Sequence, residues 1–312
     1  MSPANPYSWW PRESVVKHLR NELVYHRSNA KANTKAKPRL QSILVFAVPA
    51  VVLGVVLLTL WARFEKMFIF FPDADVAYTP EMVGLEYQDV YFSTEDGHTL
   101  HGWYVPGSTD LTWLWFHGNG GNIGHRVEEI GQINRRLGVN LFIFDYRGYG
   151  NSSGEPSEGG TYSDARAARQ YLLSQTDVAP DKVIYFGRSL GAAVSLELAV
   201  EHPPAGLILV SPFSSLKDMA RIAYPRLPLA GWLAGNRYNS LERIARVSSP
   251  TIIVHGEQDE VVPVAQGQKL HQAANEPKHF QLIPGAGHND TYTAGGSIYW
   301  DSLTEFMDTL DK

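Results

Sequence analysis

A serine between two glycines is the part of this chain best suited to chemistry. It is Ser189 in the pentapeptide GRSLG, which follows an apolar run at 182–186 and opens a helix-forming run at 190–201. Glycines two residues either side of the serine allow a tight strand-to-helix turn without Cβ clashes, and the start of a helix favours negative charge near the hydroxyl. We therefore predict that Ser189 is a nucleophile.

A serine hydroxyl becomes a strong nucleophile only when a histidine removes its proton, and that histidine needs a carboxylate to orient it. Asp259 lies in a loop after the strand-like run 251–255, and His288 follows the strand-like run 279–283. Both lie just past the carboxyl end of a predicted strand, where open α/β sheets place their sites. The order serine, aspartate, histidine predicts Asp259 as the orienting acid and His288 as the general base.

Other acids and histidines compete for these two roles. Glu257 and Glu260 flank Asp259 and are alternative acids, whereas Asp290 is expected to be solvated or to cap a helix. A catalytic imidazole must reach over the nucleophile, and the glycine-flanked loop of His288 suits that better than a helix face or a strand. Of the other histidines, His255 is expected to pack locally at the end of its strand, His271 to lie on a helix face and His279 at the start of a strand.

Backbone N–H groups are also required where an acyl-transfer intermediate gains charge. Leu190, directly after the serine, is predicted to supply one such group, and Asn119 in the loop HGNGGN at 117–122 the second. A glycine-rich loop before a helix can instead bind phosphate, but the P-loop pattern G-x-x-x-x-G-K-[ST] is absent from the sequence. A further strand-end cluster, DYRGYG at 145–150, is interpreted as a rigid turn buttressed by Arg147.

Strand and helix patterns alternate from residue 85 onward, as a mostly parallel sheet requires. The first two strand-like runs are joined by a turn at 95–97 and predict an antiparallel hairpin. The expected fold is α/β, with a mostly parallel eight-stranded sheet, helices on both faces and a short apolar cap at about 212–247 that can receive an acyl chain. The predicted strands are 85–92, 100–105, 111–116, 140–145, 182–186, 206–210, 251–255 and 279–283, and the predicted helices are 123–137, 161–175, 190–201, 264–274 and 298–310.

Residues 40–62 contain no charged side chain and are mostly apolar. A helix of this length can cross about 30 Å of hydrocarbon, so the segment predicts a single transmembrane helix. Pro49 and Gly54 are compatible with it, because both residue types are common in membrane helices. A cleaved signal peptide is the main alternative. It fits less well, because the polar tail 1–39 precedes the run and no small-x-small cleavage site follows it.

Charges on either side of the span predict its orientation. Five Lys or Arg residues occupy 27–39, whereas the juxtamembrane linker 63–84 contains only Arg63 and Lys66. By the positive-inside rule, the N-terminus is expected in the cytoplasm and the catalytic domain at 85–312 outside it.

The composition excludes several classes of protein. The chain has no cysteine, which rules out disulfides, thiolate zinc sites, a cysteine nucleophile and an S-palmitoyl anchor. A net charge of -5, with no zinc-finger pattern or long basic run, argues against a nucleic-acid partner. No cofactor or metal is expected. The expected partners are the lipid bilayer, through 40–62, and a small or lipid-like acyl substrate.

The stretch from residue 85 to 310 resembles the α/β-hydrolase superfamily in the order of its elements and in the motifs HGN, DYRGYG, GRSLG, HGEQDEVVP and GAGH. It is similar in particular to the small-lidded branch of alpha/beta-hydrolase-domain-containing proteins that carry an N-terminal membrane anchor. The resemblance implies esterase, lipase or thioesterase-like activity, and related members include enzymes that remove palmitate from proteins. The tail 1–39 lies outside this resemblance.

The leading hypothesis is hydrolysis of a carboxylic ester or thioester through an acyl-enzyme on Ser189. A serine peptidase is the alternative among enzymes, although the propeller or large cap of prolyl-type relatives is absent from this sequence. A catalytically inactive, membrane-bound ligand-binding or scaffold protein is the alternative outside enzymes.

Overall fold

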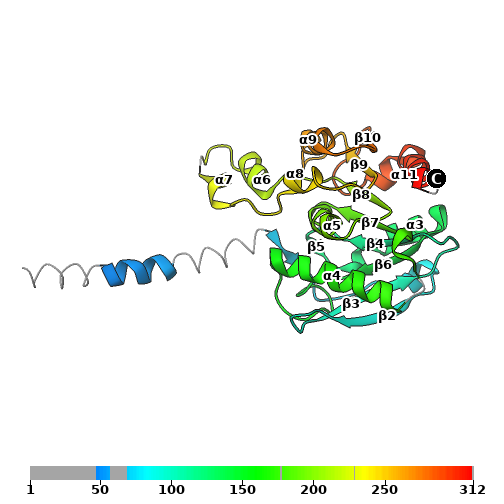
Figure 1. The fold of residues 1–312 in the computed structure, drawn as a ribbon, viewed down its shortest axis with the longest axis horizontal. Helices are drawn as coiled ribbons and strands as arrows, with labels where there is room; N and C mark the ends of the chain where they lie inside the picture. The colour runs from blue at the N-terminus through cyan, green and yellow to red at the C-terminus, as the bar shows by residue number, and fades with distance from the viewer. Residues whose placement is uncertain (1–46, 57–68, 176–177, 228, 311–312) are drawn as a thin grey trace, which may run out of the picture. The chain divides into compact units, whose positions relative to one another are not determined.

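The computed structural model describes residues 47–56, 69–175, 178–227 and 229–310. The chain divides into two compact units, Met1–Phe64 and Glu65–Lys312. In the first unit the described residues form one helix, over 47–56, which is blue in Figure 1. Its side chains are mostly exposed and apolar.

The predicted transmembrane span is therefore described only in part. Its residues 47–56 are helical, and its two ends at 40–46 and 57–62 lie outside the described residues, as does the predicted tail 1–39. Across the ranges that the structure describes, no helix combines the length and the apolar character needed to cross a bilayer.

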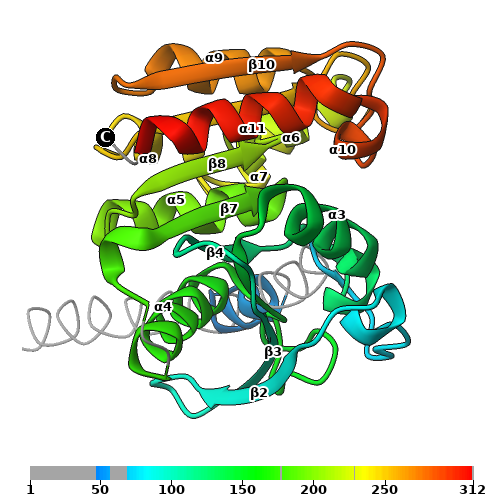
Figure 2. The same cartoon turned by 90° about the vertical axis from the view of Figure 1, so that its right-hand side faces the viewer.

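An eight-stranded sheet forms the centre of the second unit (Figure 2). Its strand order is β10-β9-β8-β7-β4-β6-β3-β2, and neighbouring strands are parallel except where β3 pairs with β2 and with β6. The predicted hairpin and the predicted mostly parallel sheet are both confirmed. The strands are β2 Gln88–Ser93, β3 Thr99–Val105, β4 Thr112–Phe116, β6 Asn140–Phe144, β7 Val183–Arg188, β8 Gly206–Val210, β9 Thr251–Gly256 and β10 Lys278–Ile283.

Helices cover both faces of this sheet, so its central strands are buried on two sides (Figure 1). Every residue of β4, β7, β8 and β9 is buried. One apolar core lies under α3 and α11, and a second lies under α4, α5, α8 and α9. The helices are α3 Val127–Leu137, α4 Glu158–Gln175, α5 Leu190–Glu201, α8 Ser240–Ile244, α9 Ala265–Ala273 and α11 Gly296–Leu310.

Only α5 begins at its predicted residue: α9 and α11 begin within two residues of the predicted starts, and α3 and α4 differ by three or more. The predicted helix at 123–137 starts with a separate 3-10 turn, η2 Ile123–Arg126, before α3. Helix α4 starts at Glu158, ahead of the predicted residue 161, because Thr161 N–H already donates to the Ser157 carbonyl oxygen at 2.8 Å. Glycine has a low helix propensity, so the glycines at 159 and 160 argued against a helix there and this first turn was not predicted.

The second unit begins before the predicted domain boundary at residue 85. Within the predicted linker, β1 Phe71–Pro72 forms a two-stranded parallel sheet with β5 Gly120–Gly121. Phe70 is buried in the core next to it. Three further short elements are η1 Pro80–Val83, η3 Pro180–Lys182 and α10 Thr291–Ala294.

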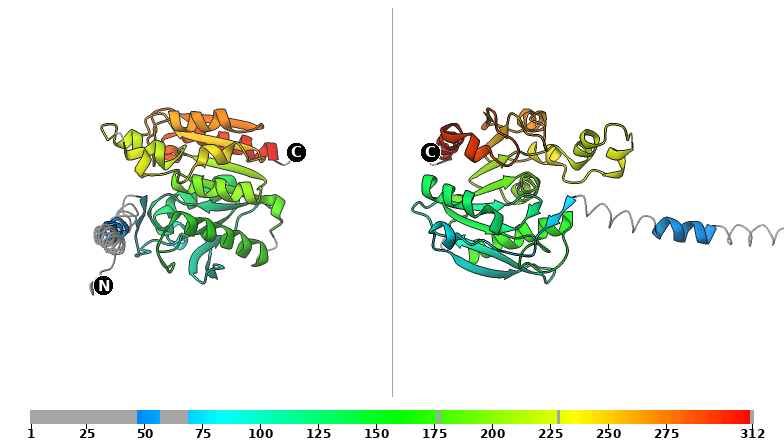
Figure 3. Two further views of the ribbon diagram at one scale, coloured as in Figure 1. Left: turned by 60° about the vertical axis from the view of Figure 1, so that its left-hand side comes forward. Right: turned by 180° about the vertical axis from the view of Figure 1, so that it is seen from behind.

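The predicted cap lies between β8 and β9 and is more helical than its prolines and glycines indicate. It contains α6 Leu216–Ala223 and α7 Ala230–Leu233, followed by α8. In Figures 1 and 3, α6 and α7 stand out from the rest of the second unit, at the end away from α11.

Candidate active site

Ser189 occupies the turn between β7 and α5. It is the N-cap residue of α5, with φ 52° and ψ -114°. A positive φ is uncommon for a residue with a side chain and costs backbone strain, which persists only where the surrounding structure enforces it. The turn presents the serine side chain at the carboxyl edge of the sheet, as the GRSLG pattern predicts.

The two glycines of this motif are required by close packing of the backbone. A Cβ on Gly187 would lie 2.6 Å from the Cα of Ala192, and a Cβ on Gly191 would overlap the carbonyl oxygen of Phe116. Both positions therefore exclude any larger residue, because the first turn of α5 lies directly against the ends of β7 and β4.

The three predicted triad side chains lie within hydrogen-bond distance of one another. His288 Nε2 is 3.1 Å from Ser189 Oγ, and His288 Nδ1 is 2.8 Å from Asp259 Oδ2. His288 and Asp259 are buried, whereas Ser189 is partly exposed. In the tautomer that this chain of contacts favours, Nδ1–H donates to the carboxylate and Nε2 accepts from the hydroxyl.

Asp259 is held as a carboxylate. Its Oδ1 accepts from the N–H groups of Val261, at 3.0 Å, and Val262, at 2.7 Å. Burial alone raises the pKa of this carboxyl, but hydrogen bonds from His255 and His288 and the Val262 amide outweigh burial, so the pKa of Asp259 lies well below its ordinary value. The acid therefore stays ionised and can stabilise a charged imidazole.

His255 was expected only in local packing, and it also supports the acid. Its Nε2 lies 2.8 Å from the Val262 carbonyl oxygen and 3.4 Å from Asp259 Oδ2, and its ring is fully buried. Its position at the end of a buried strand, four residues before the acid, was the available signal in the sequence.

The alternative acids and bases do not reach the reacting side chains. Glu257 accepts from the Gly285 N–H at 3.1 Å, and Glu260 accepts from the backbone N–H of His288 at 3.4 Å. Asp290 is the N-cap residue of α10 and accepts from the Gly287 N–H. Two histidines contact aromatic rings instead: His271 lies against Phe280 and His279 against Phe306.

The predicted oxyanion loop passes beside the nucleophile. A Cβ on Gly118 would lie 3.7 Å from the Cβ of Ser189, so the peptide between Gly118 and Asn119 runs alongside that residue. Leu190 is the first residue of α5, and the N–H at that position has no acceptor within its own helix. Both predicted donors therefore lie next to Ser189.

His117 orients the peptide that carries the Asn119 N–H. Its Nδ1 lies 2.7 Å from the Gly118 carbonyl oxygen, and burial with the nearby charge of Arg126 lowers the pKa of His117 to about 3. The neutral ring donates from Nδ1 to this carbonyl. Because the C=O and N–H groups of a trans peptide point in opposite directions, this contact turns the Asn119 N–H the other way.

The DYRGYG turn supports the same loop. Tyr146 donates its hydroxyl to the His117 carbonyl oxygen at 3.1 Å, and Tyr149 donates to the Asn119 carbonyl oxygen at 2.8 Å. Arg147 forms ion pairs with Asp96 and Asp164, which agrees with its interpretation as a buttress. Sequence reasoning assigned no role to either tyrosine, although both stand in the DYRGYG motif.

Arg188 links the nucleophile turn to the histidine loop. This buried side chain lies 2.5 Å from Glu129 Oε1 on α3, and it donates to the backbone carbonyl oxygen of His288 at 3.3 Å. A buried charge pair of this kind persists only with further hydrogen bonds, which Thr291 supplies at 3.3 Å. No sequence pattern predicted the contact between Arg188 and Glu129.

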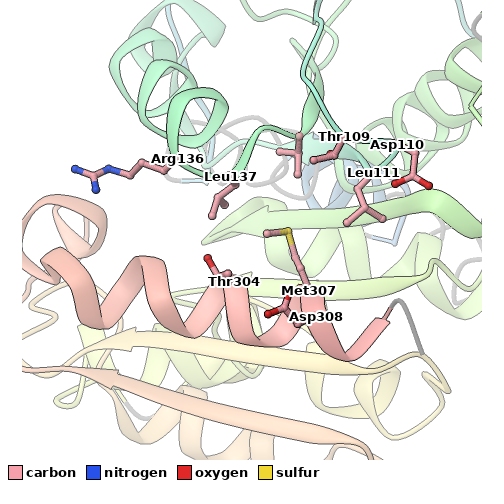
Figure 4. Close-up of a pocket in the computed structure, with 9 residues that line it drawn as sticks. Thr109, Asp110, Leu111, Arg136, Leu137, Thr304, Met307 and Asp308 are labelled. Atoms are coloured by element: carbon pink, nitrogen blue, oxygen red, sulfur yellow. The ribbon is translucent and has the colours of Figure 1, made fainter.

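A cavity of about 240 Å³ lies elsewhere in the second unit (Figure 4). Leu111 and Val139 in its wall immediately precede β4 and β6, so it opens at the amino edge of the sheet, whereas Ser189 lies at the carboxyl edge. Among the described residues, no group of three or more His, Asp or Glu side chains is arranged to hold a metal ion.

Comparison with known proteins gives several matches. A family profile described as serine aminopeptidase, S33 matches residues 108–243. An uncharacterized protein of Mycobacterium tuberculosis is 40% identical over 272 residues, which cover 86% of this chain and 96% of that protein. Alpha/beta hydrolase domain-containing protein WAV2 of Arabidopsis thaliana is 33% identical over 283 residues, which cover 83% of this chain and 91% of that protein.

Solved structures share the fold at lower identity. An esterase of Pyrococcus furiosus superposes with a TM-score of 0.67 and is 22% identical, and the alignment covers 77% of this chain and 98% of the esterase.

Proposed function

This chain belongs to the alpha/beta hydrolase superfamily, and from that premise we propose that it is a membrane-anchored serine hydrolase. The proposed reaction is hydrolysis of carboxylic ester or thioester bonds in acyl or lipid-like substrates. The observation that carries the proposal is the pair of hydrogen bonds that joins Asp259 to His288 and His288 to Ser189 at a strained turn.

In the proposed acylation, His288 Nε2 takes the hydroxyl proton while Ser189 Oγ bonds to the acyl carbon. The carbonyl electrons move to oxygen, and the N–H groups of Asn119 and Leu190 stabilise that oxyanion. When the intermediate collapses, the leaving alkoxide or thiolate takes the proton from the imidazolium. Asp259 stays ionised throughout and balances the charge on the ring.

Deacylation follows the same path with water as the nucleophile. His288 removes a proton from water as the water oxygen bonds to the acyl carbon, and Ser189 Oγ then leaves and regains that proton. The products are a carboxylic acid and the free enzyme. No cofactor is required by this sequence of steps.

The anchor in this proposal is the apolar segment 40–62, and it rests on the sequence. Its length suits a single span, and the excess of basic residues at 27–39 favours a cytoplasmic N-terminus with the catalytic domain outside the cytoplasm. A tether of this kind raises the effective concentration of the enzyme toward substrates in the same membrane.

Labelling with a fluorophosphonate probe tests the nucleophile. The full chain in detergent should be labelled, and Ser189→Ala should not. Ser195→Ala is the matched control, because Ser195 lies on the same helix and its hydroxyl only bonds the Ala192 carbonyl oxygen. Equal labelling of Ser189→Ala and the unmodified protein would contradict the proposal. Absence of labelling in all three proteins would favour the catalytically inactive scaffold protein.

A serine peptidase is the second candidate, because the family profile that matches residues 108–243 is described as a serine aminopeptidase. The two candidates share the acyl-enzyme and differ in the leaving group. A panel of matched p-nitrophenyl esters, acyl thioesters and aminoacyl p-nitroanilides separates them. Turnover of the anilides with a kcat/KM above that of the esters would assign the peptidase.

A further inference from the structure

The cap exposes an unusual set of apolar side chains. Trp232 is the most exposed large apolar side chain among the described residues, at 74%. Clustered exposure of this kind marks a surface that meets a partner or a membrane. The apolar set is Ile222, Tyr224, Leu227, Leu229 and Trp232.

The same segment is basic in a chain that is acidic as a whole. Residues 216–239 contain four basic side chains and one acidic side chain, whereas the chain carries a net charge of -5. The single acid, Asp218, contacts Arg221 within the segment at 3.4 Å and Lys269 outside it at 2.7 Å, so the segment keeps an excess of basic side chains. Exposed Trp and Leu side chains beside Lys and Arg are the combination that binds the interface of an anionic bilayer.

The cap also lies at the same edge of the sheet as β1, the first strand of the domain. The cap follows the carboxyl end of β8, and β5, which pairs with β1, follows the carboxyl end of β4. Because β4, β7 and β8 are parallel neighbours, the cap and β1 lie at the same edge of the sheet. Phe71 in β1 is itself 53% exposed there.

The connection to the proposed anchor is short. Only residues 63–68 separate the predicted span 40–62 from Ile69 of the domain, and six residues reach about 20 Å at most. If 40–62 spans the bilayer, the carboxyl edge of the sheet must therefore lie near the membrane surface.

From these observations we propose that the exposed cap side chains of Leu227, Leu229 and Trp232 dock on an anionic lipid surface, in the boundary between headgroups and acyl chains. The proposal rests on the proposed anchor for its orientation and is independent of hydrolysis. It deepens the proposed function, because docking would hold the carboxyl edge of the sheet, where Ser189 lies, at the membrane that contains the proposed acyl substrates.

The absence of cysteine makes the docking directly measurable in the full chain. Leu229→Cys and Glu305→Cys, each labelled with an environment-sensitive fluorophore, compare the cap with an exposed control position on α11. Both proteins are reconstituted in vesicles of phosphatidylcholine and phosphatidylserine that contain a nitroxide-labelled lipid. We expect blue-shifted emission at position 229 and quenching several-fold greater than at position 305.

Charge is tested in the same assay. Arg226→Glu should reduce quenching at position 229, and so should vesicles of phosphatidylcholine alone, because both remove electrostatic attraction. Quenching at 229 that does not exceed quenching at 305 would overturn the docking proposal. A blue shift without lipid quenching, which grows with protein concentration, would also overturn it and assign the surface to a second copy of the chain.

Failure of docking and failure of the proposed function are distinguishable. Ser189→Ala in the Leu229→Cys background should show unchanged quenching, because the readout requires no hydrolysis. Lipid quenching in a protein without esterase activity would keep the docking proposal and remove the proposed reaction. Esterase activity without lipid quenching would keep the proposed reaction and remove the docking proposal.

Discussion

The hydroxyl of Tyr149 donates to the carbonyl oxygen of Asn119 at 2.8 Å. This contact ties the DYRGYG turn to the residue proposed as the second oxyanion donor. Tyr149 is 0% exposed, so no water replaces the bond if it is lost. The hydroxyl is therefore a positioning group for the oxyanion loop.

Tyr149→Phe should lower kcat about 10-fold, less than the loss of a donor itself, with little change in KM. It should also weaken binding of an alkyl boronate that mimics the tetrahedral intermediate, which a change in general stability would not do selectively. Tyr78→Phe is the control, because Tyr78 is 55% exposed. A rise in KM at constant kcat would assign Tyr149 to substrate binding instead.

Substitution within the triad should be far more severe than substitution of the flanking acids. Ser189→Ala, His288→Ala and Asp259→Asn should each lower kcat about 10³-fold or more, because the three groups act as one unit. Glu257→Gln and Glu260→Gln serve as controls, since their carboxylates contact backbone N–H groups. Steady-state hydrolysis of a short soluble ester is the measurement, and a larger loss at either glutamate than at Asp259 would reassign the acid.

Stability should depend on pH through Asp259. The pKa of this carboxyl is lowered in the folded protein, so its contribution is complete above the unfolded pKa of about 3.9 and is lost as the pH falls toward the folded value. The Tm of the unmodified protein should exceed that of Asp259→Asn at pH 7, and this difference should shrink below about pH 4. A difference that grows on acidification would contradict the lowered pKa.

The N-terminal boundary of the catalytic unit can be tested by two truncations. Removal of residues 1–64 should leave a folded domain that cleaves short soluble esters, because the compact unit begins at Glu65. Removal of 1–84 should destabilise it by about 2 kcal/mol or more, since it deletes the buried Phe70 and strand β1. Thermal unfolding and ester hydrolysis measure both. Equal Tm values for the two truncations would show that 65–84 is only a linker.

Topology is a separate prediction from the charges around 40–62. A reporter fused after Lys312 should be active only outside the cytoplasm, because the basic residues at 27–39 hold the N-terminus inside. A pair of reporters that are active on opposite sides of the membrane provides the measurement and its internal control. Activity of the cytoplasmic reporter alone would place the catalytic domain on the inner side.

The order of the elements and the identity of the three triad residues can be predicted from the residue pattern alone. Periodic apolar runs predict β7 and α5, and the serine between two glycines at the turn that joins them then predicts a nucleophile. Ser189 and His288 are 99 positions apart, yet both were predictable, because parallel strands bring their carboxyl ends to one edge.

The side chains that support those groups become visible only when the packed elements are placed in three dimensions. Arg188 and Glu129 are 59 positions apart on different elements, and Tyr149 reaches Asn119 across 30 positions. Contacts of this kind depend on side-chain direction and on the distance between packed elements, which sequence periodicity does not encode. Strand β1 and the short cap helices were not predicted for a similar reason. Elements of two to eight residues gain their stability from packing rather than from a local sequence pattern.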